Sequence, residues 1–143
     1  MPLIKIAQFN YYFMHNKIPH RKNLWKWNIV NTPTCEECNV IDNCEHFIFS
    51  CKSIKYFWKN IVEVLNIIYN SKIQLMWKHI IFGYMINYEK FDIMNLILCT
   101  ASFAVYKAKV LKQRHVECFL KEELIYINYG MKNKIIREFV KQV

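Results

Sequence analysis

The chain has 143 residues, of which 54% are hydrophobic and 16% aromatic. That content excludes a disordered polar chain, and the length suits a single core, so we expect residues 1–143 to form one domain. With 20 Lys and Arg against 11 Asp and Glu, the net charge of +9 would attract a polyanion such as nucleic acid or an acidic membrane surface. A solvated lysine-rich surface without such a partner is the alternative.

The first residues do not resemble an export signal, since Lys5 and Gln8 interrupt them. The longest apolar run, 93–106, contains Asn95 and Thr100 and falls short of the roughly 20 residues of a membrane span. We therefore expect no membrane partner and an intracellular protein, nuclear or cytoplasmic, whose six cysteines are reduced.

Only two glycines and three prolines occur, which favours long helices and an all-α fold. Apolar residues are dense enough over 3–16 for a buried helix, which Pro19 follows. A short helix is expected over 21–29, with these core candidates: Leu24, Trp25 and Ile29. Its basic residues are expected to be exposed: Arg21, Lys22 and Lys26. For its two tryptophans, core packing is a simpler interpretation than base stacking, and Trp27 is expected to be the more exposed.

Four of the six cysteines fall between residues 35 and 51, and two of them form a Cys-x2-Cys pair. Such a pair lets two thiolates from one tight turn bind the same ion, and a His and a Cys five positions apart can complete a tetrahedral zinc site. Asn39 follows the pair and suits a left-handed turn residue. The ligand set we predict is Cys35, Cys38, His46 and Cys51.

Cys44 also lies in this segment and is the alternative to His46 as the third ligand. We favour His46, because its spacing from Cys51 leaves the chain room to turn and Cys44 serves equally well as a small buried residue. Either Glu45 or Asp42 could accept the free ring N–H of His46. A site with four protein ligands has no open position, so one structural zinc ion is the expected cofactor.

Residues 51–69 have helical periodicity, and Ser50 is a candidate N-cap. Three lysines lie on one face beside the metal site and are candidate phosphate contacts: Lys52, Lys55 and Lys59. Further helices are expected over 75–82, from Asp92 to about Arg114, and over 116–129. A loop is expected over 85–90, and the pattern repeats weakly over 131–143.

The sequence also predicts where some of these helices end and which of their residues are buried. Gly83 and Gly130 are expected to end the helices before them. Ile93, Leu96, Ile97, Ala104 and Leu111 are expected to face inward in a central helix, and Cys99 and Cys118 to be buried thiols. The fold class is therefore an all-α bundle of roughly five to seven helices, with a zinc knuckle over 33–52 and a helical tail over 53–143.

The whole pattern resembles the zinc-binding domain that follows the reverse transcriptase in non-LTR (LINE-type) retrotransposon polyproteins. The resemblance rests on the Cys-x2-Cys pair, an acidic segment at 42–46, the His-x4-Cys spacing, and Trp58 seven residues past the last cysteine. Flanking similarity lies at 16–27, 80–83, 95–98 and 106–107. Asn43 and Asn39 replace the family's usual Thr and Gly without touching the ligands.

The resemblance implies a non-catalytic accessory domain that binds RNA or DNA and partners a reverse transcriptase. Basic residues would neutralise phosphates while Trp27 stacks on an unpaired base: Arg21, Lys22, Lys26, Lys52, Lys55 and Lys59. A zinc-stabilised protein-interaction module and a truncated, decayed or repurposed retroelement fragment are the alternatives. No enzyme and no small-molecule substrate are expected, because Asp42 and Asp92 are the only aspartates and no glycine-rich phosphate loop occurs.

Overall fold

The computed structural model describes residues 2–84 and 92–143. Within them it contains seven α-helices, a π-helical turn (η1) and a 3-10 turn (η2). Their bounds are α1 Pro2–Met14, α2 Arg21–Lys26, η1 His46–Ser50, η2 Lys52–Ile54, α3 Lys55–Tyr69, α4 Trp77–Phe82, α5 Asp92–Leu111, α6 Val116–Met131 and α7 Lys134–Gln142. The expected all-α bundle is confirmed, and the knuckle lies between α2 and α3 as predicted. The loop expected over 85–90 lies outside the described residues.

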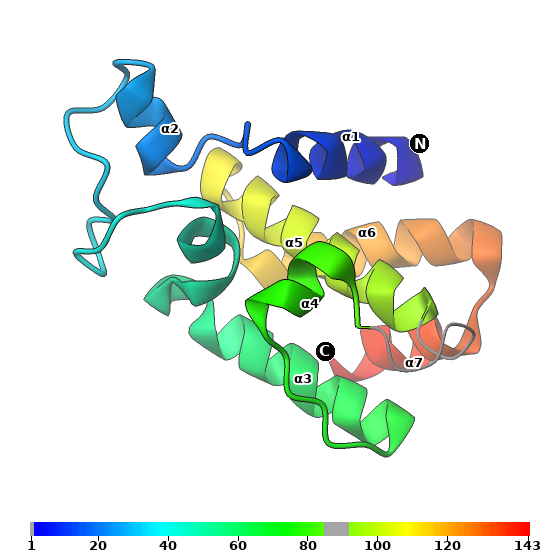
Figure 1. Ribbon diagram of the computed structural model, residues 1–143. Coiled ribbons are helices and arrows are strands. Elements are labelled where there is room, and N and C mark those ends of the chain that lie inside the picture. The colour runs from blue at the N-terminus through cyan, green and yellow to red at the C-terminus, as the bar shows by residue number, and fades with distance from the viewer. Residues whose placement is uncertain (1, 85–91) are drawn as a thin grey trace.

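Helix α5 is the centre of the bundle, and α1, α4, α6 and α7 all pack against it (Figure 1). Several of its inward side chains are fully buried, including Met94, Ile97 and Ala104, while the predicted core residues Ile93 and Leu96 are half-buried. Ile93–Leu111 is long and apolar enough to cross a membrane by length and composition, contrary to the expectation that this run is too short. Half of that segment is buried inside the bundle, which accounts for its apolar character.

Helix α3 joins the knuckle to the rest of the core. The helical periodicity predicted over 51–69 is confirmed, since Phe57, Trp58 and Ile61 are buried on one face of α3. Trp58 Nε1 donates a hydrogen bond of 2.8 Å to the carbonyl of Ile48 in η1, which satisfies the indole N–H in the core. The metal-binding turn is thereby attached to α3 from inside the molecule.

Helix α7 closes the bundle against α3 and α6. Asn133 caps it, with its side chain accepting from the backbone N–H groups of Ile135 and Ile136. Phe139 and Ile136 are fully buried. The weak periodicity over 131–143 therefore does encode a helix with a narrow apolar face.

Three side chains expected in the core are exposed instead: Trp25 by 45%, Ile29 by 66% and Leu111 by 47%. Helix α2 has only six residues, and polar contacts hold it in place. The buried Asn23 amide donates to the carbonyls of Asn16 and Ile18. Apolar burial is not what positions α2, so its tryptophans are left on the surface.

At three further positions, two helix ends and the burial of one thiol differ from what the sequence predicts. Ser50 does not cap α3, because the extended residue Cys51 and the 3-10 turn separate them. Gly130 lies inside α6, which ends at Met131 and is followed by Lys132 in the left-handed conformation (φ 52°). Cys118 is exposed. The prediction that Gly83 ends the helix before it is confirmed, since Gly83 follows α4 with φ 83°.

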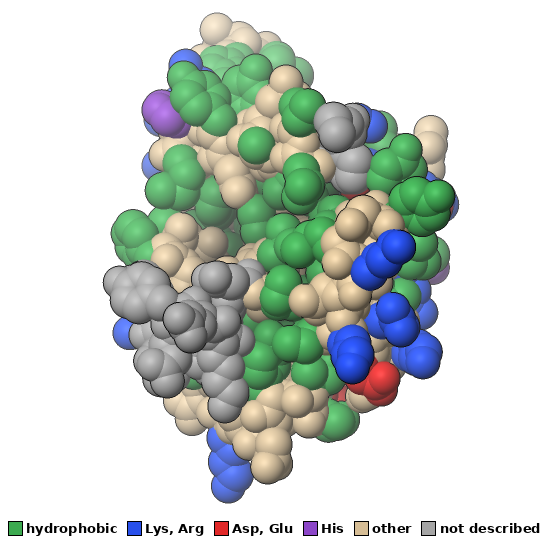
Figure 2. Space-filling view, turned by 90° about the vertical axis from the view of Figure 1, so that its right-hand side faces the viewer, with side chains coloured by type: hydrophobic (Ala, Val, Ile, Leu, Met, Phe, Trp, Pro, Cys, Tyr) green, Lys and Arg blue, Asp and Glu red, His purple; other side chains and the backbone are tan. Residues whose placement is uncertain are grey.

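Figure 2 looks onto the end of the molecule opposite the knuckle. Hydrophobic side chains occupy much of this face, and Lys and Arg side chains gather along one edge of it. Basic residues therefore lie on more than one side of the protein, so net charge alone does not identify a binding surface.

Candidate metal centre and basic surface

The first half of the knuckle is a tight two-stranded turn. An antiparallel bridge pairs Thr34 with Ile41, and the backbone N–H of Cys35 donates to the carbonyl of Val40 at 2.8 Å. Asn39 adopts the left-handed conformation, with φ 55°, and its N–H donates to the carbonyl of Cys35 at 2.9 Å. The predicted role of Asn39 as a left-handed turn residue is confirmed. This turn places the thiols of Cys35 and Cys38 on one side.

The second half is η1, where the backbone N–H of Cys51 donates to the carbonyl of His46 at 3.0 Å. This bond joins residues five positions apart, as in a π-helix, and it places the two ligands of the His-x4-Cys motif, His46 and Cys51, on the same side. The side chain of Asn43 accepts from the N–H of His46 at 2.9 Å. Asn43 therefore caps this turn, a role that a Thr at the same position would also be able to fill.

The two halves bring all four predicted ligands together. One ligand atom from each of Cys35, Cys38, His46 and Cys51 lies within 4.8 Å of the other three. The sulfur atoms of Cys38 and Cys51 are 3.9 Å apart. Zinc–sulfur bonds of about 2.3 Å in a tetrahedron imply an S···S edge of about 3.8 Å. The donor set and spacing therefore fit one tetrahedral zinc ion.

Comparison with known proteins agrees with this geometry. Residues 2–58 match the family model described as zinc-binding in reverse transcriptase. No curated protein and no solved structure matches the chain. The matched segment covers less than half of the chain, from α1 through the knuckle to Trp58 in α3. The resemblance found in the sequence is thus confirmed for this zinc-binding segment.

The surroundings of Cys51 and His46 favour the protonation states that bind zinc, whereas burial raises the pKa of the Cys35 thiol. Burial opposes ionisation of Cys51, but hydrogen bonding to Ser53, whose Oγ lies 3.2 Å from the sulfur, together with Lys109, lowers the pKa of the thiol. Burial lowers the pKa of His46, so the imidazole is neutral and able to donate a lone pair. The backbone N–H of Lys52 donates to the sulfur of Cys38 at 3.4 Å. These contacts suit thiolate and neutral imidazole ligands.

Cys44 lies outside the ligand cluster. Burial, with a contribution from Asp42, raises the pKa of the Cys44 thiol to about 12, so it stays protonated at neutral pH. A protonated thiol is a poor zinc ligand. The geometry therefore favours His46 over Cys44 in the choice that the spacing left open.

Asp42 connects the metal site to α2. Its Oδ2 accepts the N–H of Arg21 at 2.9 Å, its carbonyl accepts the N–H of Lys22 at 3.1 Å, and its Oδ1 faces His46 Nε2 at 3.9 Å. Glu45, the other candidate partner of His46, is exposed. Asp42 is thus the carboxylate placed to orient the imidazole.

The predicted phosphate contacts occupy different environments. The three lysines of α3 and η2 are exposed, as are Lys26 and Trp27, whose exposed fraction is 49%. Lys22 is half-buried. Arg21 is also half-buried, and its Nη1 lies 3.3 Å from Glu36 Oε1. Arg21 is therefore the one member of the predicted set already engaged by a carboxylate within the described residues.

A cavity of about 520 Å³ opens beside the metal ligands. It is lined by Cys35 and Cys51 on the knuckle and by Lys109 and Lys112 at the end of α5. The ammonium of Lys109 also lies 4.7 Å from the centre of the Phe47 ring. The sequence did not indicate a connection between Lys109 and the metal site, because 58 positions separate Lys109 from Cys51.

Proposed function

We propose that this chain is a non-catalytic, zinc-organised domain that binds RNA or DNA and assists a reverse transcriptase, in an element of the non-LTR type. The observation that carries the proposal is the link between the metal site and a lysine row. The N–H of Lys52 donates to the Cys38 sulfur, so the first cation of the row is attached to a metal ligand. Zinc binding therefore also orders the start of this surface.

The lysine row consists of Lys52, Lys55 and Lys59. All three side chains are exposed, and their spacing of three and four residues aligns them along η2 and the first turns of α3. In residues 2–84 and 92–143, carboxylate partners are found for Arg21, Lys107 and Arg114, but for no member of this row. Unpaired, exposed ammonium groups are suited to contact phosphates and release counterions.

Helix α2 supplies a second part of the same proposal. Trp25 and Trp27 expose 45% and 49% of their surface beside Lys22 and Lys26. Exposed indoles next to cations can stack on unpaired bases. The finding that Trp25 is on the surface, contrary to expectation, adds a second aromatic ring to this region.

Salt-dependent binding tests the proposal. In fluorescence anisotropy titrations with labelled RNA and DNA, log affinity should fall with log salt, with a slope steeper than about −3 if four or more cations contact phosphate. The triple variant Lys52→Gln/Lys55→Gln/Lys59→Gln should bind more weakly and reduce the magnitude of the slope by about two to three. No measurable binding of the wild-type protein at near-physiological salt would overturn the proposal.

A charge-matched control distinguishes binding by the lysine row from attraction by the protein's net charge. The triple variant Lys132→Gln/Lys134→Gln/Lys141→Gln removes the same charge from exposed lysines at and around α7, away from the knuckle. We expect it to bind nearly as wild type. Equal losses in the two triple variants would show that binding is nonspecific attraction to a basic protein rather than recognition by the lysine row.

A further inference from the structure

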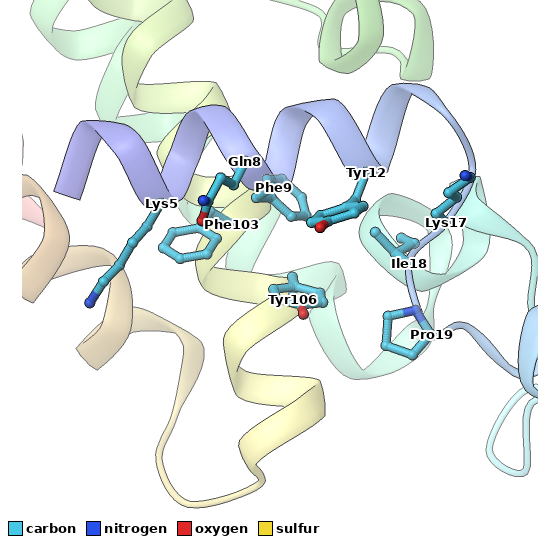
Figure 3. Close-up of a pocket in the computed structure, with 9 residues that line it drawn as sticks. All are labelled: Lys5, Gln8, Phe9, Tyr12, Lys17, Ile18, Pro19, Phe103 and Tyr106. Carbon is cyan, nitrogen blue, oxygen red and sulfur yellow. The ribbon is translucent and has the colours of Figure 1, made fainter. Parts of the chain in front are cut away.

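A second surface feature lies between α1 and α5, outside the zinc-binding knuckle. It is a groove of about 370 Å³ lined by α1, by the segment that follows it, and by α5. Figure 3 shows Tyr12 of α1 facing Tyr106 of α5 across the groove, with Phe9 and Phe103 beside them and one lysine toward each end. The proposed lysine row does not include any of these residues.

The groove is built from aromatic rings held in fixed positions. The ring centroid of Phe9 lies 5.5 Å from that of Phe103 and 5.2 Å from that of Tyr106. Phe9 and Phe103 are buried, whereas Tyr106 is half-buried and Tyr12 is 52% exposed. The buried pair forms a rigid support, and the two tyrosines present accessible ring surface above it. Such surfaces bind planar ligands by stacking.

The charge of the groove is positive at both ends. Lys5 and Lys17 are exposed, and the nine residues that line the groove, all in the described part of the chain, include no carboxylate. Gln8 adds an amide that can donate to and accept from a base edge. An aromatic floor flanked by cations is complementary to a ligand with flat apolar rings and negative charges on either side of them.

The length of the groove favours a strand over a single nucleotide. Lys5 and Tyr12 both lie in α1 and are seven positions apart, which at 1.5 Å per helical residue corresponds to roughly 10 Å, and Lys17 lies beyond the end of that helix. Stacked nucleotides advance about 3.4 Å each, so a strand of about three of them would span this part of the groove. A duplex keeps its base faces stacked on one another, and only an unpaired strand can offer them to Tyr12 and Tyr106.

We infer that the α1–α5 groove binds a short single-stranded segment of nucleic acid, with bases on Tyr12 and Tyr106 and phosphates at Lys5 and Lys17. This inference rests on the proposed function in assigning a nucleic-acid partner, and it adds a separate site with a preference for unpaired strands. The lysine row would then contact phosphates of either duplex or single strand, while the groove distinguishes between them.

The test compares two neighbouring tyrosines of α1. Tyr12 lines the groove, while Tyr11 is 58% exposed on the same helix and does not line it. The zinc-loaded full chain is titrated with labelled oligothymidylate and with a DNA duplex of equal length. Tyr12→Ala should weaken single-strand binding roughly tenfold, within the range for loss of one stacking ring, and leave duplex binding unchanged. Tyr12→Phe and Tyr11→Ala should both bind the single strand as wild type.

Lys17→Gln provides a second variant that leaves the aromatic core intact. It should weaken single-strand binding and reduce its salt slope by about one. Photocrosslinking with thiothymidine-substituted oligonucleotide, mapped by mass spectrometry, should label peptides that contain Tyr12 or Tyr106. If Tyr12→Ala and Tyr11→Ala bind alike and crosslinks appear elsewhere, the groove inference is wrong, and an apolar ligand or protein segment is the better occupant.

The outcomes separate this inference from the proposed function. Binding that depends on the lysine row but not on Tyr12 overturns the groove alone. Binding that depends on Tyr12 but not on the lysine row supports the groove and overturns the role given to the row. Absence of binding to both single strand and duplex overturns both.

Discussion

His46 Nε2 lies 3.9 Å from Asp42 Oδ1, and both side chains are buried. Among the described residues, neither atom has a hydrogen-bond partner. The distance is slightly too long for a hydrogen bond, and a small closure on metal binding would form one. A carboxylate that holds the second ring nitrogen of a zinc-bound imidazole fixes its orientation and raises its basicity.

Removing that carboxylate charge should weaken metal binding without unfolding the protein. Asp42→Asn keeps a side-chain oxygen for the N–H of Arg21 but loses the negative charge toward His46. We expect zinc affinity, measured by competition with a chromophoric chelator, to fall roughly 10- to 100-fold. Glu45→Gln, at an exposed neighbouring position, is the control and should bind zinc as wild type. Equal affinities of the two variants would show that Asp42 does not orient the ligand.

Lys109 should act as the counter-ion of the metal site. Three thiolates and one Zn²⁺ leave one net negative charge, and Lys109 lowers the pKa of Cys51 from the cavity beside it. Lys109→Met should reduce zinc affinity by up to about fivefold, the scale of a partly exposed ion pair. Lys112→Met, which removes an exposed charge from the same cavity, should have a smaller effect. An unchanged affinity for Lys109→Met would contradict this role.

The six cysteines should differ in reactivity. Cys118 is exposed and should be alkylated first by iodoacetamide at neutral pH. Burial raises the pKa values of Cys44 and Cys99, so both thiols should react slowly. The three ligand thiols should be protected until a chelator removes the metal. Peptide mapping by mass spectrometry measures the extent of alkylation at each cysteine. In a separate measurement, the Cys44→Ala variant should keep its zinc. Loss of zinc in that variant would show that Cys44 is a ligand.

His20 should make folding stability depend on pH. The ring is fully buried, caps α2 through Nδ1 and contacts Asn16 through Nε2, and burial lowers its pKa. Below the unfolded-state pKa of about 6.5, the unfolded chain binds a proton before the folded chain does, so the free energy of unfolding falls as pH decreases. This loss continues down to the lowered folded-state pKa.

Urea unfolding at a series of pH values, for wild type and His20→Asn, measures this effect. Asparagine also serves as an N-cap but does not titrate, so the variant should lose less stability on acidification. Release of zinc is common to both proteins and cancels in the comparison. His15→Asn, at an exposed position, is the control. The same pH dependence in wild type and His20→Asn would exclude His20 as the titrating group.

The metal site and the helix pattern were predictable because both are encoded over short distances in the chain. The spacing of Cys35, Cys38, His46 and Cys51 determines which ligands a turn can bring together, and Asn39 marks the turn itself. The buried faces of α3 and α6 follow helical periodicity. The bounds of these elements were less accurate, since Gly130 continues α6 and Ser50 does not begin α3.

Features that depend on distant contacts were not predictable. Trp25 and Ile29 are apolar, but buried polar bonds of Asn23 position α2 and leave them exposed. The groove pairs Tyr12 with Tyr106, which are 94 positions apart, and no local pattern relates them. The contact between α1 and α5 is likewise not predictable from local sequence patterns. It includes a hydrogen bond of 2.8 Å from Asn10 to the Cys99 sulfur.

Metal content is the most direct test of the account, because the zinc site organises both the knuckle and the start of the lysine row. Native mass spectrometry of the purified wild-type chain should show one zinc ion, and Cys38→Ser should show none, with loss of ordered structure around 33–52. A folded wild-type protein without zinc, or a Cys38→Ser variant that keeps it, would contradict the four-ligand site and the function proposed from it.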